Sequence, residues 1–456
     1  MIAIKLRQYC LWIHRYTGLF MAGFLIMAGI TGALLAFHDE LDEAFNHQLV
    51  NVPPQNAPLL PIARLHDNVI QTYPNYSFSS LPVIIAPNKS VVFSVDRSRD
   101  KSKSAAKPLF QEVYVNPYSG KIIGTRDKEA WRVQNVMWKV FWLHRELLLG
   151  DVGKLLLGVV ALIWTINCFI GFYLTLPRPT KTRQNRAKKR ASLLKRWLPA
   201  WKIRTKTNTF KLNYDLHQAF GLWLWVIFLV IAWSSVGFNL KQVYRPVMQA
   251  MIGLEEKQRK ADKPQAKAAN QPKGNSKKPQ AMPTDDKHYA VTKANSVTYL
   301  SQQAAVLAKD RGVIIQKPLG ARWDSEEKAW QLRFKTNKDI GQKGGASSIT
   351  VDAKSGVVTR SHFGDESAAA EKTDQWLSSL HMGHIGKDAG HLAYQLFLAL
   401  VGIALSVASG AGIYLWNQGR LQRQASKRRE LIKTRYPQSP VDPHAEAPSP
   451  QHYKAS

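Results

Sequence analysis

Long apolar runs alternate with polar stretches along the chain, and four of the runs are long enough to cross a membrane. A spanning helix needs about 20 apolar residues. The four runs that meet this requirement are Thr17–Phe37, Val152–Leu176, Ala219–Leu240 and Leu392–Trp416. The first run is longer than the apolar core of a signal peptide, and no small-residue cleavage site precedes Asp39. We therefore expect an α-helical integral membrane protein with four retained transmembrane helices.

The two longest connections between these runs have the pattern of small α+β modules. Apolar and polar positions alternate over residues 78–96 and 112–125 in the first connection, and over 328–336 and 347–361 in the second. A helical pattern precedes each set of strands, at 60–74 and at 297–312. We expect one module in each connection.

Each module carries the same turn. Asn116-x-x-Ser119-Gly120 in the first matches Asp352-x-x-Ser355-Gly356 in the second. Such a turn predicts a hairpin in which the glycine supplies the positive φ angle. The expected segments are a first span in 1–38, a first module in 39–130, an approach helix with the second span in 131–177, a basic loop in 178–213, a third span in 214–240, a second module in 241–375 with a disordered insertion at about 255–290, an approach segment with the fourth span in 376–417, and a basic tail in 418–456.

Basic residues gather beside the apolar runs. The chain has 63 Lys and Arg against 32 Asp and Glu, a formal net charge of +31. Twelve Lys and Arg and no acid lie between Arg178 and Lys206, and the tail from Arg420 to Arg435 is similarly basic. This distribution is typical of cytoplasmic loops, so we expect both termini in the cytoplasm and both modules outside it. Lipid is then the partner of the apolar surface, and nucleic acid is not a partner because no nucleic-acid motif accompanies the charge.

Histidines occur at related positions in the two halves of the chain. His14 opens the first span and His217 the third, each four residues before a Gly-Leu pair. His144 precedes the second span and His381 the fourth, each nine residues before a glycine. The chain therefore reads as two tandem copies of one unit, related by a pseudo-two-fold axis along the membrane normal.

This symmetry pairs the histidines across the axis. We expect His14 to face His217 near the cytoplasmic side and His144 to face His381 near the external side. A single histidine at a helix end is more often a hydrogen-bonding residue than a ligand. Four at related positions favour two pairs of axial ligands for haem iron within the bundle.

Other residues are weaker candidates for the same sites. His38 ends the first span, His391 competes with His381 for the outer position, and His384 lies three residues after His381. Arg15 and Arg145 each follow an expected ligand, where a guanidinium could pair with a haem propionate. Four glycines lie at the levels where a flat macrocycle would need space: Gly32, Gly171, Gly237 and Gly410.

Cysteine usage and missing motifs limit the chemistry. The two cysteines are Cys10 and Cys168, and no Cys-x-x-Cys-His occurs, so any haem must be b-type and is not covalently attached. An iron–sulfur site also lacks its thiolates. No dinucleotide, P-loop, serine-hydrolase or zinc-protease motif is present, and no catalytic side chain is assigned.

These stretches together resemble the PepSY-associated transmembrane family. The first span with its "LWIHRYTG" start, the "FWLHRELLLGDVGK" approach, "LHQAFGLW" and "LHMGHIGKDAGH" look like the family's successive helices, and "VYVNPYSGKIIG" and "ITVDAKSGVVT" look like the strand–turn–strand signatures of its PepSY domains. Members of the FoxB and PiuB type are inner-membrane proteins, and the FoxB type is a dihaem ferrisiderophore reductase.

The resemblance implies two b-type haems held by His14, His217, His144 and His381. It also implies reduction of siderophore-bound Fe(III) on the periplasmic side of a bacterial inner membrane. The sequence shows no site for an electron donor, so a quinol or a separate reductase must supply the electrons. Reduction suits iron release because siderophore oxygen ligands hold Fe(III) far better than Fe(II).

Two other classes of function remain open at this stage. A regulatory protein would use the modules to bind a peptide or a periplasmic peptidase, and its histidines would hold no haem. A siderophore or iron transporter would need polar residues near mid-membrane and interrupted helices. The central stretches of the four runs contain almost no polar residue.

Overall fold

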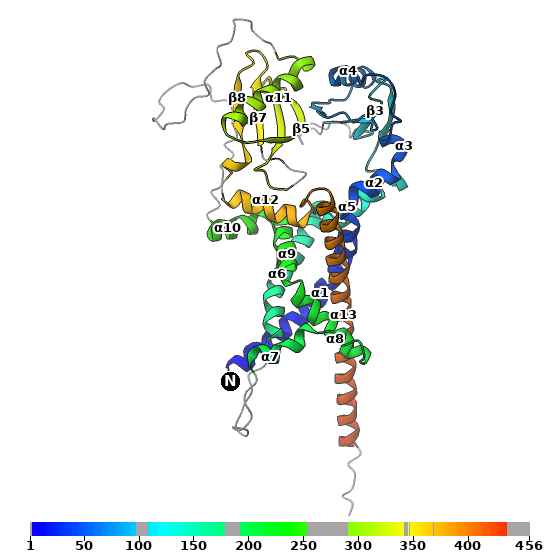
Figure 1. The fold of residues 1–456 in the computed structure, drawn as a ribbon. Helices are drawn as coiled ribbons and strands as arrows, with labels where there is room; N and C mark the ends of the chain where they lie inside the picture. Colours follow the sequence, from blue (N-terminus) through cyan, green and yellow to red (C-terminus); the bar gives the residue numbers. More distant parts are fainter. Residues whose placement is uncertain are drawn as a thin grey trace, which may run out of the picture.

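A bundle of long helices carries a domain of strands and short helices on one end (Figure 1). This computed structural model describes residues 2–96, 108–177, 192–252, 291–341, 345, 347–367 and 369–435. The N-terminal end of α1 and the far end of α13 lie at the opposite end from the strands. We call the two ends of the bundle the sheet end and the terminal end, and the upper part the strand domain.

Three helices of the bundle are long and apolar enough to cross a membrane by themselves. They are α1 (Ile2–Leu35), α6 (Asp151–Thr175) and α13 (Ala389–Arg435). The fourth candidate span consists of α8 (Thr209–Trp223) and α9 (Trp225–Asn239), which meet at an angle of 71°. The described residues therefore hold three spans, or four if the bent pair counts as one.

The third span, expected in 214–240, is bent. The bend falls at Leu224, whose N–H donates to the carbonyls of Phe220 and Leu222. Beyond it, the indole N–H of Trp225 donates to the carbonyl of Cys168 on α6, 2.8 Å away. Apolar residues continue through the bend, so the hydropathy pattern could not reveal it.

The fourth span and the basic tail form one element. The helix α13 has 47 residues, about 70 Å at ~1.5 Å per residue, which is more than twice the apolar thickness of a bilayer. Its basic part continues beyond the bundle at the terminal end (Figure 1). Residues 436–456 of the expected tail lie outside the described residues.

Short helices connect the bundle to the strand domain at the sheet end. They are α2 (His38–Phe45), α3 (His47–Val50), α5 (Val136–Glu146) after a 3₁₀ turn η1 (Val133–Asn135), α10 (Lys241–Ile252), and α12 (Ala369–His381) after η3 (Gly364–Glu366). At the terminal end, α7 (Leu193–Trp197) and η2 (Leu198–Trp201) precede α8.

A tight turn joins α5 to α6 directly after His144. Leu147 ends α5 in the left-handed region, and Gly150 begins α6 with φ +61°. A Cβ on Gly153 would lie 1.8 Å from the carbonyl oxygen of Glu146. Only glycine allows this approach of the two helices, which explains the glycines that follow His144 in the sequence.

The described part of the strand domain contains eight strands and two longer helices. These are α4 (Ile62–Thr72), β1 (Ser80–Leu81), β2 (Val91–Ser94), β3 (Glu112–Val115), β4 (Ile122–Arg126), α11 (Lys293–Asp310), β5 (Ile315–Asp324), β6 (Ala329–Thr336), β7 (Ser347–Asp352) and β8 (Val358–His362). All pairings are antiparallel, in one sheet of order β2-β3-β4 and one of order β1-β5-β6-β7-β8.

Both expected hairpins form. The Asn116 side chain accepts from the N–H groups of Tyr118 and Ser119, and Gly120 has φ +71°. The Asp352 side chain accepts from the N–H and hydroxyl of Ser355 in the corresponding turn. The turn chemistry of the two sequences therefore specifies the same local geometry.

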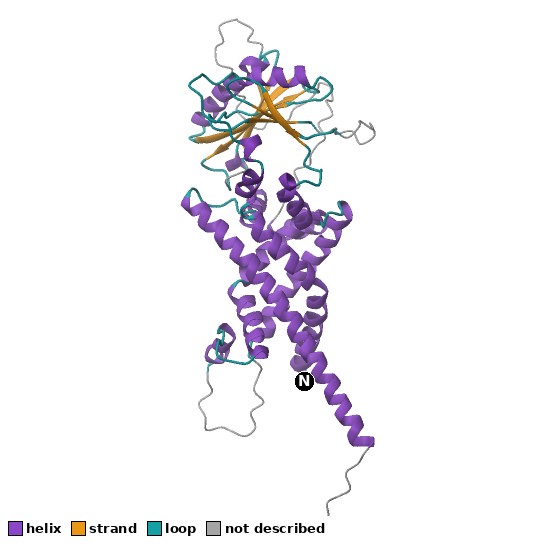
Figure 2. Cartoon of the chain, turned by 90° about the vertical axis from the view of Figure 1, so that its right-hand side faces the viewer, coloured by secondary structure: helices purple, strands orange, loops and turns teal. Residues whose placement is uncertain are grey.

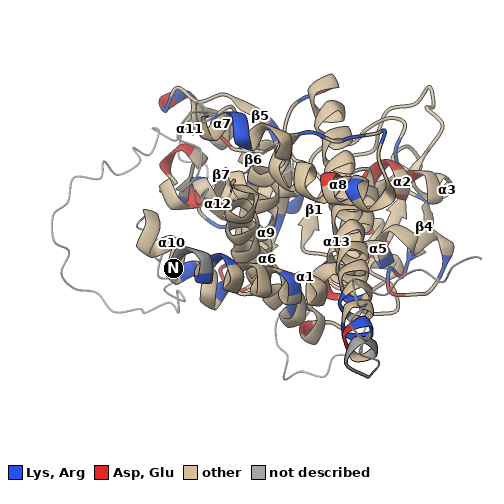
Figure 3. Cartoon of the chain, turned by 90° about the horizontal axis from the view of Figure 1, so that it is seen from below, with Lys and Arg blue, Asp and Glu red and all other residues tan. Residues whose placement is uncertain are grey.

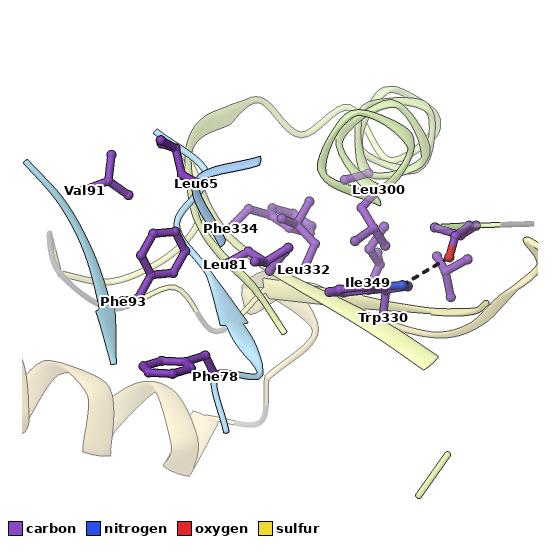
Figure 4. Close-up of a cluster of buried hydrophobic side chains, with 14 of the residues drawn as sticks. Leu65, Phe78, Leu81, Val91, Phe93, Leu300, Trp330, Leu332, Phe334 and Ile349 are labelled. Carbon is purple, nitrogen blue, oxygen red and sulfur yellow. Dashed lines mark hydrogen bonds between the residues drawn. The ribbon is translucent and has the colours of Figure 1, made fainter. Parts of the chain in front are cut away.

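Strands from the two connections join the expected modules. Ser80 and Leu81 of the first pair with Arg322 and Ala321 of the second, so β1 extends the sheet of the other connection. A shared apolar core also crosses the joint (Figure 4). It includes Phe78, Leu81 and Phe93 from the first connection and Leu300, Leu332, Phe334 and Ile349 from the second.

Neither the joint nor β5 was expected, because nothing local marks Ser80 and Leu81 as the partner of a strand 240 residues later. The expected insertion at 255–290 and residues 178–191 of the basic loop lie outside the described residues. The tandem-repeat interpretation remains a prediction.

Candidate functional site: two histidine pairs in the helical bundle

The first pair of histidines lies toward the terminal end of the bundle. His14 comes from α1 and His217 from α8, the helix before the bend. Their ring centroids are 6.0 Å apart, with an angle of 63° between the ring planes. The bend at Leu224 carries α8 away from the line of α9, and His217 therefore enters the bundle from its terminal end.

The second pair lies at the sheet end. His144 comes from α5 and His381 from the last residue of α12. Their ring centroids are 6.4 Å apart and the planes make an angle of 80°. Both residues are on short helices that precede a span. The turn after each helix therefore fixes how far its histidine ring reaches into the bundle.

A hydrogen bond fixes the tautomer of each histidine in the terminal-end pair. His14 Nδ1 donates to Asn167 Oδ1 at 3.0 Å, because the Asn167 amide nitrogen is already a donor to Thr17 and to the carbonyl of Ile163. His217 Nδ1 donates to the carbonyl of Ala408 at 2.8 Å. A carbonyl can only accept, so in both rings the proton is on Nδ1.

The same arrangement holds at the sheet end. His144 Nδ1 lies 2.9 Å from the hydroxyl of Thr31, and that hydroxyl donates to the carbonyl of Met27. His381 Nδ1 lies 2.7 Å from the hydroxyl of Ser234, which donates to the carbonyl of Ile231. Each hydroxyl therefore accepts from the imidazole. All four rings carry their proton on Nδ1 and keep a lone pair on Nε2.

The four Nε2 atoms have no hydrogen-bond partner within the described part of the chain. A histidine that ligates a metal through one nitrogen characteristically donates from the other to an oxygen, which fixes the ring and raises its basicity. Each pair thus has the protonation and support that metal ligation requires.

The separation within each pair suits one iron between two imidazoles. With metal–nitrogen bonds of about 2.0–2.1 Å, and each centroid roughly 1.1 Å behind its nitrogen, the centroids of two opposed imidazoles lie about 6.3 Å apart. The observed values of 6.0 and 6.4 Å lie on either side of this distance.

A bare metal ion fits less well than haem. No group of three or more His, Cys, Asp or Glu side chains comes together among the described residues. Protein sites for bare zinc or iron take at least three such ligands. A haem supplies the equatorial nitrogens itself and needs only the axial pair. The donor set therefore fits a haem at each pair.

Three glycines let helices pack directly against these rings. A Cβ on Gly32 would lie 3.3 Å from Cε1 of His144, and a Cβ on Gly171 equally close to Cε1 of His14. Gly412 has the same relationship to His217. Of the four glycines expected near haem, Gly32 and Gly171 lie at the predicted levels, whereas Gly237 packs on Tyr244 and Gly410 has no neighbour within 4 Å.

The weaker histidine candidates lie outside both pairs. His38 packs edge-on against the rings of Trp138 and Phe141 and contacts Asp39. His391 Nδ1 donates to the carbonyl of Ile385 in the turn before α13. The geometry thus places His381, and not His391, opposite His144. His384 belongs to the same turn, where its backbone N–H donates to Ser379.

The two arginine candidates make few contacts. Arg145 is exposed and lies over the ring of Phe141, with its guanidinium carbon 5.7 Å from the centroid. Arg15 is partly exposed and has no ion-pair partner among the described residues. Within the part of the chain that the structure describes, neither side chain forms a hydrogen bond with a histidine of the pairs.

The residues that orient the imidazoles were not expected from the sequence. Thr31, Asn167 and Ser234 lie on α1, α6 and α9 and accept from His144, His14 and His381 respectively. Asn167 gave the clearest signal, because it is an amide inside an apolar run. A serine or threonine in such a run can bond to its own helix, so it carries little information.

An apolar core separates the two pairs. Along α1, Thr31 lies 17 residues after His14, about 26 Å at ~1.5 Å per residue. The space between contains Trp164 of α6 and Phe228 of α9, whose ring centroids are 5.9 Å apart, packed with Met21 and Val401.

Comparison with known proteins agrees with the resemblance read from the sequence. The family described as the PepSY-associated TM region matches residues 11–418. This stretch includes the four paired histidines, the bent helix pair and the strand domain. No curated protein matches the chain as a relative. The chain is a membrane protein that belongs to the family of the PepSY-associated TM region.

Proposed function

We propose that this protein is a dihaem transmembrane reductase that delivers electrons to ferric iron held by siderophores on the periplasmic side of a bacterial inner membrane. The observation that carries the proposal is the shared chemistry of the four histidines. Each keeps a free Nε2 while its Nδ1 donates to a neighbouring helix, and each pair has the centroid separation of an iron with two imidazole ligands. A b-type haem at each pair would supply a one-electron carrier.

The chain's own residues hold and insulate these sites. Asn167, Thr31 and Ser234 orient three of the rings, and the carbonyl of Ala408 orients the fourth. The apolar core around Trp164 and Phe228 excludes water between the two levels. One pair near each end of the bundle divides a membrane crossing into shorter steps.

The orientation in the membrane follows from charge. Figure 3 views the molecule from the terminal end and marks Lys and Arg positions in blue along α13 and near the N-terminus. Described basic residues at this end include Lys195, Arg196, Arg420, Arg423 and Arg428. Cytoplasmic segments are rich in such residues. We therefore infer that the terminal end is cytoplasmic, with both termini, and that the strand domain is periplasmic.

The reaction takes one electron for each Fe(III) reduced to Fe(II). The siderophore then holds its metal weakly, because hard oxygen ligands prefer the more highly charged ion. A quinol in the membrane or a separate reductase at the cytoplasmic face would supply the electrons.

The bent span is the one feature that favours a transporter, since transporters use interrupted helices at mid-membrane sites. Here the bend lies beside the apolar contact of Trp225 with Phe172, and what it positions is His217. The bend therefore supports the histidine pairs rather than a polar substrate site. A regulatory protein that binds a peptide or peptidase would not need four matched Nδ1 acceptors.

A reduced-minus-oxidised visible spectrum of the purified protein, with haem quantified per chain, tests the proposal. We expect two b-type haems per chain. His14→Ala and His381→Ala should each retain one haem, whereas His38→Ala and His391→Ala should retain both. Colourless protein after expression with ample haem would exclude the reductase. Full haem content in His381→Ala with loss in His391→Ala would overturn the assignment of the sheet-end pair.

Activity can be followed separately. Fe(II) appearing from a ferric siderophore is trapped by a chromogenic Fe(II) chelator after chemical reduction of the protein. If the protein contains two haems per chain but releases no Fe(II), the haem sites are supported and the proposed ferric-siderophore substrate is wrong.

A further inference from the structure

One face of the five-stranded sheet packs against the helix α11. Leu300 and Ala304 of α11 pack in the core with Leu332, Phe334 and Ile349 of the sheet. Side chains alternate between faces along a strand. The residues between these apolar positions therefore point away from α11. Figure 2 shows the strands at the end of the molecule above the helical bundle.

The strand register collects cations on this second face, the one that points away from α11. Lys335 of β6 lies opposite Lys317 of β5, and Gln331 lies opposite Arg322. Arg333 lies on β6 between Lys335 and Gln331 and pairs with Ser348 of β7. Directly opposite residues share a face in an antiparallel pair. Four cations from two adjacent strands thus point the same way.

Three of these cations donate hydrogen bonds to neutral groups. Within the described residues, Lys317, Arg322, Arg333 and Lys335 form no ion pair with a carboxylate. Arg322 donates to the hydroxyl of Ser79, Arg333 to the carbonyl of Gly345, and Lys335 to the carbonyl of Gly341. Such neutral partners orient the cations and leave their charge available.

Lys335 shows the electrostatic cost of this arrangement. Lys335 is buried, with only 8% of its surface exposed. Burial, and then the charges of Lys387 and Lys317, lower its pKa from the usual value, while Asp339 acts in the opposite direction. A bound anion would offset both the burial and the repulsion between like charges.

The cationic face meets the bundle beside the sheet-end histidine pair. Lys387, which acts on Lys335, lies in the turn between α12 and α13, six residues after His381. The loop that follows β6 packs on α12, since a Cβ on Gly341 would lie 2.4 Å from the Ser379 hydroxyl oxygen. Ser379 is two residues before His381.

A shallow cleft next to Gln331, on the β6–β8 side of the sheet and reaching Leu307 of α11, has the size of a small-molecule site. Its volume is about 570 Å³, and its lining includes Gln331, Ser348, Thr350, Arg360 and His362. Small-molecule sites commonly measure about 300–1,000 Å³. Amide, hydroxyl and imidazole groups supply hydrogen bonds there, while Arg360 is paired with Glu327 at the rim.

We propose that the cationic face formed by Lys317, Arg322, Arg333 and Lys335 binds small ferric chelates that carry negative charge, such as those with carboxylate ligands. This inference rests on the proposed reductase function for the identity of the metal. The charge complementarity selects an anion, and the cleft volume selects a small molecule over a polypeptide. The proximity to α12 would retain the chelate next to the sheet-end pair.

Gallium(III) citrate tests the binding without any electron transfer, because Ga(III) has no stable divalent state. Binding to the full-length protein in detergent is measured by equilibrium dialysis at low and at moderate salt. Arg333→Glu should weaken binding at least tenfold, and Arg333→Gln by less. Arg333 is exposed, so neither change should disturb folding. The matched control is Lys121→Glu, an exposed charge change in the turn between β3 and β4.

These results test the anion site separately from the reductase proposal. Equal losses in Arg333→Glu and Lys121→Glu, or undetectable binding by the unaltered protein, would overturn the anion site even if two haems are present. If metal-free citrate binds as tightly as the gallium complex, the site binds simple anions, and the proposal that it binds metal chelates is wrong. Gallium binding by a haem-free protein would instead uphold the site and count against the reductase.

Discussion

Asn167 Oδ1 accepts a hydrogen bond from Nδ1 of His14 at 3.0 Å, across the contact between α6 and α1. The amide cannot turn around, because its nitrogen already donates to Thr17 and to the carbonyl of Ile163. One polar residue inside an apolar span thus fixes the tautomer of an imidazole on another helix. Each of the other three paired histidines also donates from Nδ1 to an acceptor on another helix, so the same hydrogen-bond arrangement occurs in both pairs.

Asn167→Leu should weaken the terminal-end haem site, because the ring of His14 would lose its acceptor. Loss of such a supporting group costs about 10- to 100-fold in metal affinity. Haem retained per chain after dilution measures the effect. Asn167→Asp keeps an acceptor and makes the imidazole more basic, so it should retain haem and lower that haem's midpoint potential. Unchanged potentials and haem content in both variants would show that Asn167 has only a packing role.

Gly32→Leu should remove the haem at the sheet end while leaving the other. A Cβ at this position would lie 3.3 Å from Cε1 of His144, and the rest of a leucine side chain would displace the ring. The spectrum and haem content provide the measurement. Gly23→Leu on the same helix is the control, because Gly23 is exposed and has no neighbour within 4 Å. A similar loss in both variants would point to general disruption of α1.

Asp42→Asn should lower the stability of the folded protein where the strand domain joins the bundle. The carboxylate of Asp42 on α2 accepts two hydrogen bonds from the guanidinium of Arg126, at 2.7 and 2.8 Å, and Arg126 also binds Asn135. The Arg126 side chain is only 4% exposed. Breaking such a buried pair costs about 3–5 kcal/mol. Thermal unfolding should show it, and the double variant Asp42→Leu with Arg126→Met should recover part of the loss.

The strand domain should lose stability in mild acid through His66. Its Nε2 donates to the carbonyl of Phe78, and its Nδ1 is buried without a partner. Burial lowers the pKa of His66 in the folded state. The unfolded chain therefore takes up the proton first, so the stability is complete above about pH 6.5 and falls as the pH drops below that value.

Unfolding midpoints between pH 5 and 8 measure this dependence. His66→Gln can still donate to Phe78 and does not titrate in this range, so its profile should be flatter than that of the unaltered protein. Equal slopes for the two proteins would assign the acid sensitivity to other groups.

The sequence by itself determined the membrane elements and the local turns. Membrane insertion depends on the length and apolarity of a run, and both can be read directly. The hairpin turns at Gly120 and Gly356 depend on a few adjacent residues. The positions of His14, His144, His217 and His381 relative to the spans were also readable, because a matched spacing recurs in the two halves.

Only the tertiary structure decided how these parts meet. It placed His381 rather than His391 opposite His144, bent the third span at Leu224, and joined β1 to β5 across the two connections. It also brought Asn167, Thr31 and Ser234 to the rings they orient. Each of these relationships depends on packing between residues far apart in the chain, and a local pattern of apolar and polar positions contains no information about which distant surfaces will fit together.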